Sequence, residues 1–203
     1  MTYLERLESL DFSRTLLRPV KRRVLLWTGQ SGLAAAGLSA KQKEFLWAVG
    51  EDAALLSGFP FHRDCERETD AHLLAASWRN ARQTLWCATN QRYRRILAGV
   101  LQQAVASTAE KLLLICGSCG LELVNAAAGE WRQTLAPHVS IIALGPTCVR
   151  KLCLPRVFAI RGRKDRWSAC LYRGPVDAIT PGGHLDYWGC EETQRLVRAR
   201  WLA

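Results

Sequence analysis

The sequence predicts an α/β fold of three layers, α/β/α, in which a mostly parallel sheet lies between two layers of helices. Short apolar runs alternate with longer segments of helical periodicity, as expected for strands that are linked by helices. The apolar runs lack polar alternation, which is typical of strands covered on both faces. The chain has 203 residues, of which 49% are hydrophobic, and it shows no repeat or linker. We therefore expect one domain over residues 1–203, with 1–19 as a peripheral N-terminal segment.

Five apolar runs are the expected strands, and each is followed by turn residues that include glycine. They are residues 24–27, 112–115, 139–144, 156–160 and 176–179. A further stretch, 53–61, fits either a short edge strand or an irregular loop.

The segments between these runs have helix-forming composition and terminal signals. The expected helices are 40–49 with Ser39 as N-cap and Gly50 at its end, 70–89 with Thr69 as N-cap, 91–107, 121–128 ended by Gly129, and 190–201.

Charge and cysteine content limit the function classes. The net charge is +10 and the isoelectric point about 9.6, with the positive residues spread along the chain. A solvated basic surface is the simpler interpretation, and an acidic or phosphate-bearing partner is the alternative. Nucleic acid is disfavoured because no zinc-finger spacing or RNA-binding aromatic signature accompanies the charge. The sequence predicts no membrane span, no secretory signal and no cofactor, and with eight cysteines it favours reduced thiols in the cytoplasm.

Three chemically complementary side chains follow three of the expected strands. Ser118 follows 112–115, Asp165 follows 156–160 and His184 follows 176–179. Catalytic groups gather at the carboxyl ends of parallel strands. An imidazole can take the proton of a serine hydroxyl, and a carboxylate fixes the imidazole tautomer. The simpler alternatives are a helix-capping serine, a solvated acid and a structural histidine, and Asp177 and Asp186 are reserve acids.

Residues 116–120 read Cys-Gly-Ser-Cys-Gly at the junction of an expected strand and helix. Together with the chain order serine, aspartate, histidine, this pattern resembles the α/β-hydrolase superfamily over residues 20–203. That superfamily places its nucleophile in a Gly-x-Ser-x-Gly elbow, and Cys116 stands here for the first glycine. The resemblance implies a catalytic triad of Ser118, Asp165 and His184. It also implies an oxyanion hole formed by the backbone N–H groups of Cys119 and Gln30.

The resemblance further implies a small serine hydrolase that cleaves a carboxyl ester or an acyl thioester through an acyl-enzyme on Ser118. Only 11 residues lie between Leu144 and Arg156, so we expect no large lid. The expected substrate is a small-molecule or carrier-bound acyl group, and the basic charge favours an acidic carrier protein or coenzyme A.

Other functions compete for the same stretch. Cys119 is a second candidate nucleophile, disfavoured because Leu121 would crowd the elbow around it. Cys116 and Cys119 form a CxxC pair, which is also typical of a thioredoxin-like thiol-disulfide oxidoreductase. A non-catalytic α/β-hydrolase-like protein is the third possibility. Because none of them follows the last strand, three histidines are not expected to be catalytic: His62, His72 and His138. No metal site is predicted, since only one CxxC pair occurs.

Overall fold

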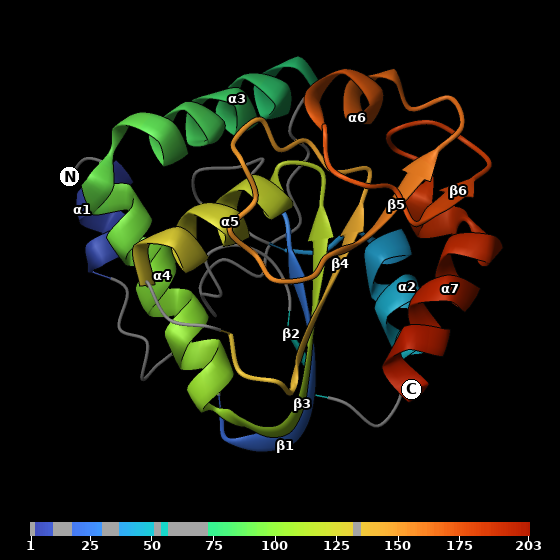
Figure 1. Ribbon diagram of the computed structural model, residues 1–203, viewed down its shortest axis with the longest axis horizontal. Coiled ribbons are helices and arrows are strands. Elements are labelled where there is room, and N and C mark those ends of the chain that lie inside the picture. Colours follow the sequence, from blue (N-terminus) through green and yellow to red (C-terminus); the bar gives the residue numbers. More distant parts are fainter. Residues whose placement is uncertain (1–2, 10–17, 30–36, 51–53, 57–72, 132–134) are drawn as a thin grey trace.

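The computed structural model describes residues 3–9, 18–29, 37–50, 54–56, 73–131 and 135–203 (Figure 1). Within these residues six strands form one sheet in the order β2-β1-β3-β4-β5-β6, and all neighbouring strands are parallel. This confirms the predicted α/β class and parallel sheet. The strands are β1 (Val20–Trp27), β2 (Ala54–Leu56), β3 (Thr108–Gly117), β4 (Val139–Leu144), β5 (Phe158–Gly162) and β6 (Ala178–Thr180).

Helices cover both faces of the sheet (Figure 1). The helices α3, α4 and α5 lie on one side with α1, and α2 and α7 lie on the other. None of the helices in the described part of the chain is long and apolar enough to cross a membrane. Their bounds are α1 (Tyr3–Glu8), α2 (Ala40–Val49), α3 (Leu73–Thr89), α4 (Gln91–Ala106), α5 (Gly120–Trp131), α6 (Arg166–Leu171), the 3-10 helix η3 (Tyr187–Gly189) and α7 (Glu191–Leu202).

The central strands supply side chains to two cores. Leu112 and Leu114 of β3 belong to the core beneath α4 and α5, and Leu113 and Ile115 belong to the core beneath α2 and α7. Successive side chains of a strand point to opposite faces, so an uninterrupted apolar run suits a strand with helices on both sides.

Several element bounds differ from the sequence-based expectations. The strand expected at 112–115 runs from Thr108 to Gly117, because its polar first residues pair with β1 through the backbone. The last two strands, β5 and β6, begin two residues later than expected, at Phe158 and Ala178. Stretch 53–61 contains a short edge strand, β2.

The helix expectations are also corrected at particular residues. Gly129 does not end its helix, since α5 continues to Trp131. The short helix α6 had no counterpart among the expected elements. Ser39 caps α2 as expected, with its side chain accepting the N–H of Gln42. Helix α3 begins at Leu73, and the expected cap Thr69 lies outside the described residues.

Candidate active site

Ser118 occupies a strained turn between β3 and α5. Its φ of 51° is the one left-handed value among the described residues other than glycine, and a side chain there costs free energy that the surroundings must offset. The Ser118 N–H donates to the carbonyl of Leu144 over 3.0 Å, and the Thr147 N–H donates to the Ser118 carbonyl over 3.1 Å. The end of β4 and the loop after it therefore hold both peptide groups that flank the serine.

Of the positions two residues before and two residues after Ser118, only the second requires glycine. A Cβ on Gly120 would lie 1.9 Å from the carbonyl oxygen of Trp27, so the approach of β1 excludes any side chain there. Cys116, two residues before the serine, is still part of β3, and its side chain is fully buried. The turn thus accepts a cysteine at the position where the superfamily pattern has its first glycine.

The structure brings the three predicted triad residues together. Ser118 Oγ lies 2.8 Å from His184 Nε2. His184 Nδ1 lies 2.9 Å from Oδ2 and 3.0 Å from Oδ1 of Asp165. The Asp165 side chain is fully buried, whereas that of His184 is 19% exposed. A hydroxyl in contact with an imidazole, which in turn contacts a carboxylate, is an arrangement that can activate a serine.

The Asp165 carboxylate is kept ionised by its hydrogen bonds. Burial alone raises its pKa, but hydrogen bonds from His184, Tyr187 and the Ser168 N–H lower the pKa further than burial raises it. The net pKa is below its ordinary value. The contact with Ser168 is an N-cap bond of 2.9 Å at the start of α6, so the unexpected helix helps to fix the acid.

Tyr187 is a site residue that the sequence analysis missed. Its hydroxyl donates to Asp165 Oδ2 over 2.6 Å and accepts the Gly162 N–H over 2.7 Å. No motif marks a tyrosine three residues after the histidine, so the chain alone offered no signal for this contact. The reserve acids have other roles: Asp177 accepts the Ala159 N–H, and Asp186 accepts the Gly183 N–H.

The predicted oxyanion donors are described only in part. The Cys119 N–H stands at the N-terminal end of α5, where helix N–H groups have no carbonyl partner within the helix. The loop after β1 reaches this point, since the Gly29 N–H donates to the Cys119 sulfur. Gln30, the second expected donor, lies outside the described residues.

The two thiols of the CxxC pair are poorly suited to redox chemistry. Both are free, and the exposed fractions of Cys116 and Cys119 are 0% and 3%. Burial raises the pKa of both thiols, that of Cys119 to about 12. A reactive thiol needs access and a lowered pKa, so the site disfavours both the oxidoreductase hypothesis and Cys119 as nucleophile. It is the Ser118 hydroxyl that contacts His184.

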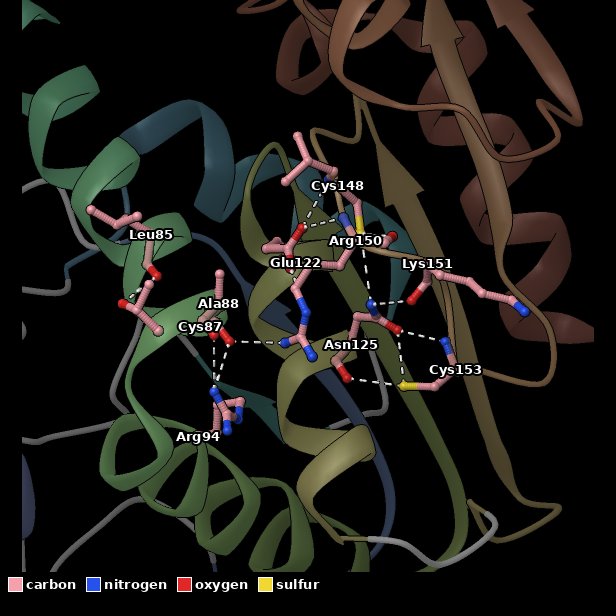
Figure 2. A network of polar contacts seen from close by, with 12 residues as sticks. Leu85, Cys87, Ala88, Arg94, Glu122, Asn125, Cys148, Arg150, Lys151 and Cys153 are labelled. Atoms are coloured by element: carbon pink, nitrogen blue, oxygen red, sulfur yellow. Dashed lines mark hydrogen bonds and ion pairs between the residues drawn. The ribbon is translucent and has the colours of Figure 1, made fainter.

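The loop between β4 and β5 is fastened to α5 by two buried polar side chains (Figure 2). Glu122 accepts the N–H groups of Val149 and Arg150 over 2.8 and 3.3 Å. Asn125 donates to the Lys151 carbonyl over 3.1 Å and accepts the Cys153 N–H over 2.8 Å. This short loop, in which no large lid was expected, is thus tied down beside α5.

The remaining histidines are not brought to the triad. The carbonyl of His138 accepts the N–H of Leu112 near the start of the apolar part of β3, at the opposite end of the strand from Ser118. His62 and His72 lie outside the described residues.

Comparison with known proteins gives similarity in structure alone. No protein-family model matches the chain, and no curated protein matches its sequence significantly. A dienelactone hydrolase-like promiscuous phosphotriesterase, P91, from metagenomic libraries is 15% identical over 91% of this chain and 83% of its own, with a TM-score of 0.49. Esterase PE8 is 19% identical over 90% of this chain and 92% of its own, with a TM-score of 0.46. A putative YdeN-like hydrolase from Pectobacterium atrosepticum is 10% identical over 97% of this chain and 96% of its own, with a TM-score of 0.45.

The site argument therefore rests on this chain's own geometry. Ser118, the predicted nucleophile, lies in a turn from strand to helix, as the resemblance to the superfamily elbow predicts. Ser118 follows β3, Asp165 follows β5 and His184 follows β6 of one parallel sheet. This sheet, this turn and this order of side chains agree with the arrangement that the resemblance to the α/β-hydrolase superfamily predicts.

Proposed function

We propose that this protein is a serine hydrolase that cleaves a carboxyl ester or an acyl thioester through an acyl-enzyme on Ser118. The observation that carries the proposal is the 2.8 Å contact between Ser118 Oγ and His184 Nε2, with the buried Asp165 behind the imidazole. The strained backbone of Ser118 supports it too, since strain of this kind is concentrated at functional sites.

In the proposed reaction His184 takes the proton of Ser118 while Oγ attacks the substrate carbonyl carbon. The negative charge that develops on the carbonyl oxygen is stabilised by the Cys119 N–H at the N-terminus of α5, and Gln30 is the proposed second donor. His184 then passes its proton to the leaving oxygen or sulfur, which departs and leaves the acyl group on Oγ. Water, deprotonated by His184, releases the acid and restores Ser118.

Labelling with a fluorophosphonate probe tests the nucleophile. Wild type and Cys119→Ala are expected to be labelled, because the alanine variant keeps the backbone N–H at position 119. Ser118→Ala is expected to lose labelling and to hydrolyse p-nitrophenyl butyrate at least about 10³-fold more slowly. If labelling survives in Ser118→Ala and is lost in Cys119→Ala, the assignment of Ser118 as the nucleophile is wrong. A wild type that is not labelled and carries a redox-active thiol pair favours the oxidoreductase.

Two positively charged side chains near the site favour a substrate with an anionic leaving group. Arg163 and Lys164 are exposed on the loop that carries Asp165. Their N–H groups donate to the carbonyls of Thr180 and Gly182, over 2.8 and 2.9 Å, so this loop lies beside the segment that leads to His184. Two exposed cations beside the triad suit a phosphate-bearing or acidic acyl carrier, such as coenzyme A or an acidic carrier protein.

Kinetics at two salt concentrations test this preference. With an acyl-coenzyme A substrate, KM is expected to rise with salt and in the double variant Arg163→Ala/Lys164→Ala, while KM for neutral p-nitrophenyl butyrate stays constant. The variant Arg195→Ala/Arg198→Ala removes the same charge from exposed positions of α7 and serves as the control. Equal salt effects on both substrates, or equal effects of both variants, contradict an anionic carrier.

A further inference from the structure

Tyr187 adds a link to the chain of contacts that ends at the nucleophile. The chain runs from the Gly162 N–H to the Tyr187 hydroxyl over 2.7 Å, and from that hydroxyl to Asp165 Oδ2 over 2.6 Å. It continues through the His184 ring to Ser118 Oγ. Tyr187 itself touches neither His184 nor Ser118 through any hydrogen bond between described residues.

The direction of the Tyr187 hydroxyl proton follows from its two partners. The Gly162 N–H can only donate, so it occupies a lone pair of the phenol oxygen. The phenol proton is then left for Asp165 Oδ2, an ionised acceptor. Tyr187 is 3% exposed and Asp165 is 2% exposed, so water does not compete at this bond. Hydrogen bonds to an ionised group in such surroundings are among the strongest in proteins.

We propose that Tyr187 is a positioning residue for the triad: it holds the Asp165 carboxylate in one orientation and as a permanently ionised acceptor for His184. This inference rests on the proposed serine hydrolase function. It goes beyond the triad because a serine, a histidine and an aspartate are sufficient for the reaction, and the sequence pattern contains no place for a tyrosine.

The carboxylate orientation is fixed by one further donor on each oxygen, besides His184. The Ser168 N–H donates to Oδ1, and Tyr187 donates to Oδ2. With both oxygens bound, the carboxylate plane cannot rotate, and both oxygens stay within 3.0 Å of His184 Nδ1. Loss of the tyrosine hydroxyl leaves Oδ2 with His184 as its remaining described partner, and it leaves the buried Gly162 N–H without its acceptor.

The same bond limits the basicity of the Asp165–His184 pair. A donor to the carboxylate stabilises the anion and so weakens the hold of the pair on a proton. Without that donor the pair protonates at higher pH, and a protonated pair cannot accept the proton of Ser118. Tyr187→Phe is therefore expected to move the acidic limb of the rate profile to higher pH.

The test compares Tyr187→Phe with Tyr172→Phe. Tyr172 is also buried, at 4% exposed, and its hydroxyl donates to the Pro175 carbonyl rather than to the triad. For p-nitrophenyl butyrate, Tyr187→Phe is expected to lower kcat about 10- to 100-fold with little change in KM, and to shift the acidic limb upward. Tyr172→Phe is expected to leave kcat and the acidic limb unchanged. Equal kcat values and equal limbs in the two variants overturn the proposal.

A second set of measurements tests the role of Tyr187 if Tyr187→Phe folds poorly or if the wild type shows no turnover. Replacing Tyr187 by 3-fluorotyrosine keeps its shape and makes the phenol a stronger donor, so the acidic limb is expected to move to lower pH. In protein labelled with ¹⁵N-histidine, the Hδ1 resonance of His184 reports the contact with Asp165 directly and needs no turnover. Absent labelling by fluorophosphonate refutes the hydrolase, whereas an Hδ1 resonance unchanged by fluorotyrosine refutes the role of Tyr187.

Discussion

Gly145, in the turn after β4, leaves room for the triad acid and its tyrosine. Its φ is +53°, and a Cβ there would lie 2.5 Å from Tyr187 Cε2 and 2.7 Å from Asp165 Oδ2. Both neighbours are buried and hydrogen-bonded, so a methyl group displaces them by up to about 1 Å before ordinary contact is reached. In Gly145→Ala the left-handed backbone costs about 1–2 kcal/mol, and overpacking costs about 1–3 kcal/mol. We expect the free energy of unfolding to fall by about 2–5 kcal/mol.

Urea denaturation of Gly145→Ala and Gly99→Ala checks this reasoning with the same change at two sites. Gly99 lies inside α4, and a Cβ there meets nothing within 4 Å, so Gly99→Ala is expected to raise the free energy of unfolding by about 0.5–1 kcal/mol. Displacement of Asp165 in Gly145→Ala is also expected to slow fluorophosphonate labelling about 100-fold. A loss of stability below about 0.5 kcal/mol, or labelling at the wild-type rate, refutes the argument.

Other perturbations give separate tests. Asp165→Asn is expected to lower kcat about 10⁴-fold by favouring the wrong imidazole tautomer, and kcat within tenfold of wild type contradicts a triad role. Because the pKa of Asp165 is lower in the folded state, its contribution to stability is present above the ordinary pKa of about 3.9 and is lost as pH falls through the folded pKa. In Asp165→Asn the midpoint of urea unfolding is therefore expected to fall less steeply as the pH is lowered than it does in the wild type. Thiol titration of the native protein with DTNB is expected to miss Cys116 and Cys119, and rapid reaction of either contradicts their burial. Ser39→Ala is expected to lower the urea-unfolding free energy by about 1 kcal/mol through loss of the α2 cap, and no change means that the cap contributes nothing.

The arrangement of the site was predictable because parallel strands end at a common edge. Apolar runs without alternation identified β3 and β4, and turn residues marked their ends. Once β3, β5 and β6 share one parallel sheet, Ser118, Asp165 and His184 must lie at the same edge. The order of the three side chains along the chain was therefore enough to group them, although it could not give the contact distances.

Other features depend on contacts that are distant in sequence. Residues 108–111 join β3 because Thr108 and Lys111 have backbone partners on β1, and this mostly polar stretch gave no strand signal. Gly129 stays helical because α5 packs in the core on both sides of it, which outweighs its low helix propensity. The bond from Tyr187 to Asp165 joins η3 to a residue 22 positions earlier in the chain, and no local pattern encodes such a contact.

The Cys-Gly-Ser-Cys-Gly stretch suited a redox pair and a nucleophile elbow almost equally by sequence, and burial separates the two chemistries. Cys116 is the last but one residue of β3 and shares the core face of that strand with Leu112 and Leu114. The left-handed turn at Ser118 lifts that side chain out of the sheet toward His184. Cys119 then turns back against the Gly29 N–H. The backbone that presents the hydroxyl thus buries both sulfurs, so the same turn that favours a serine nucleophile disfavours a disulfide chemistry.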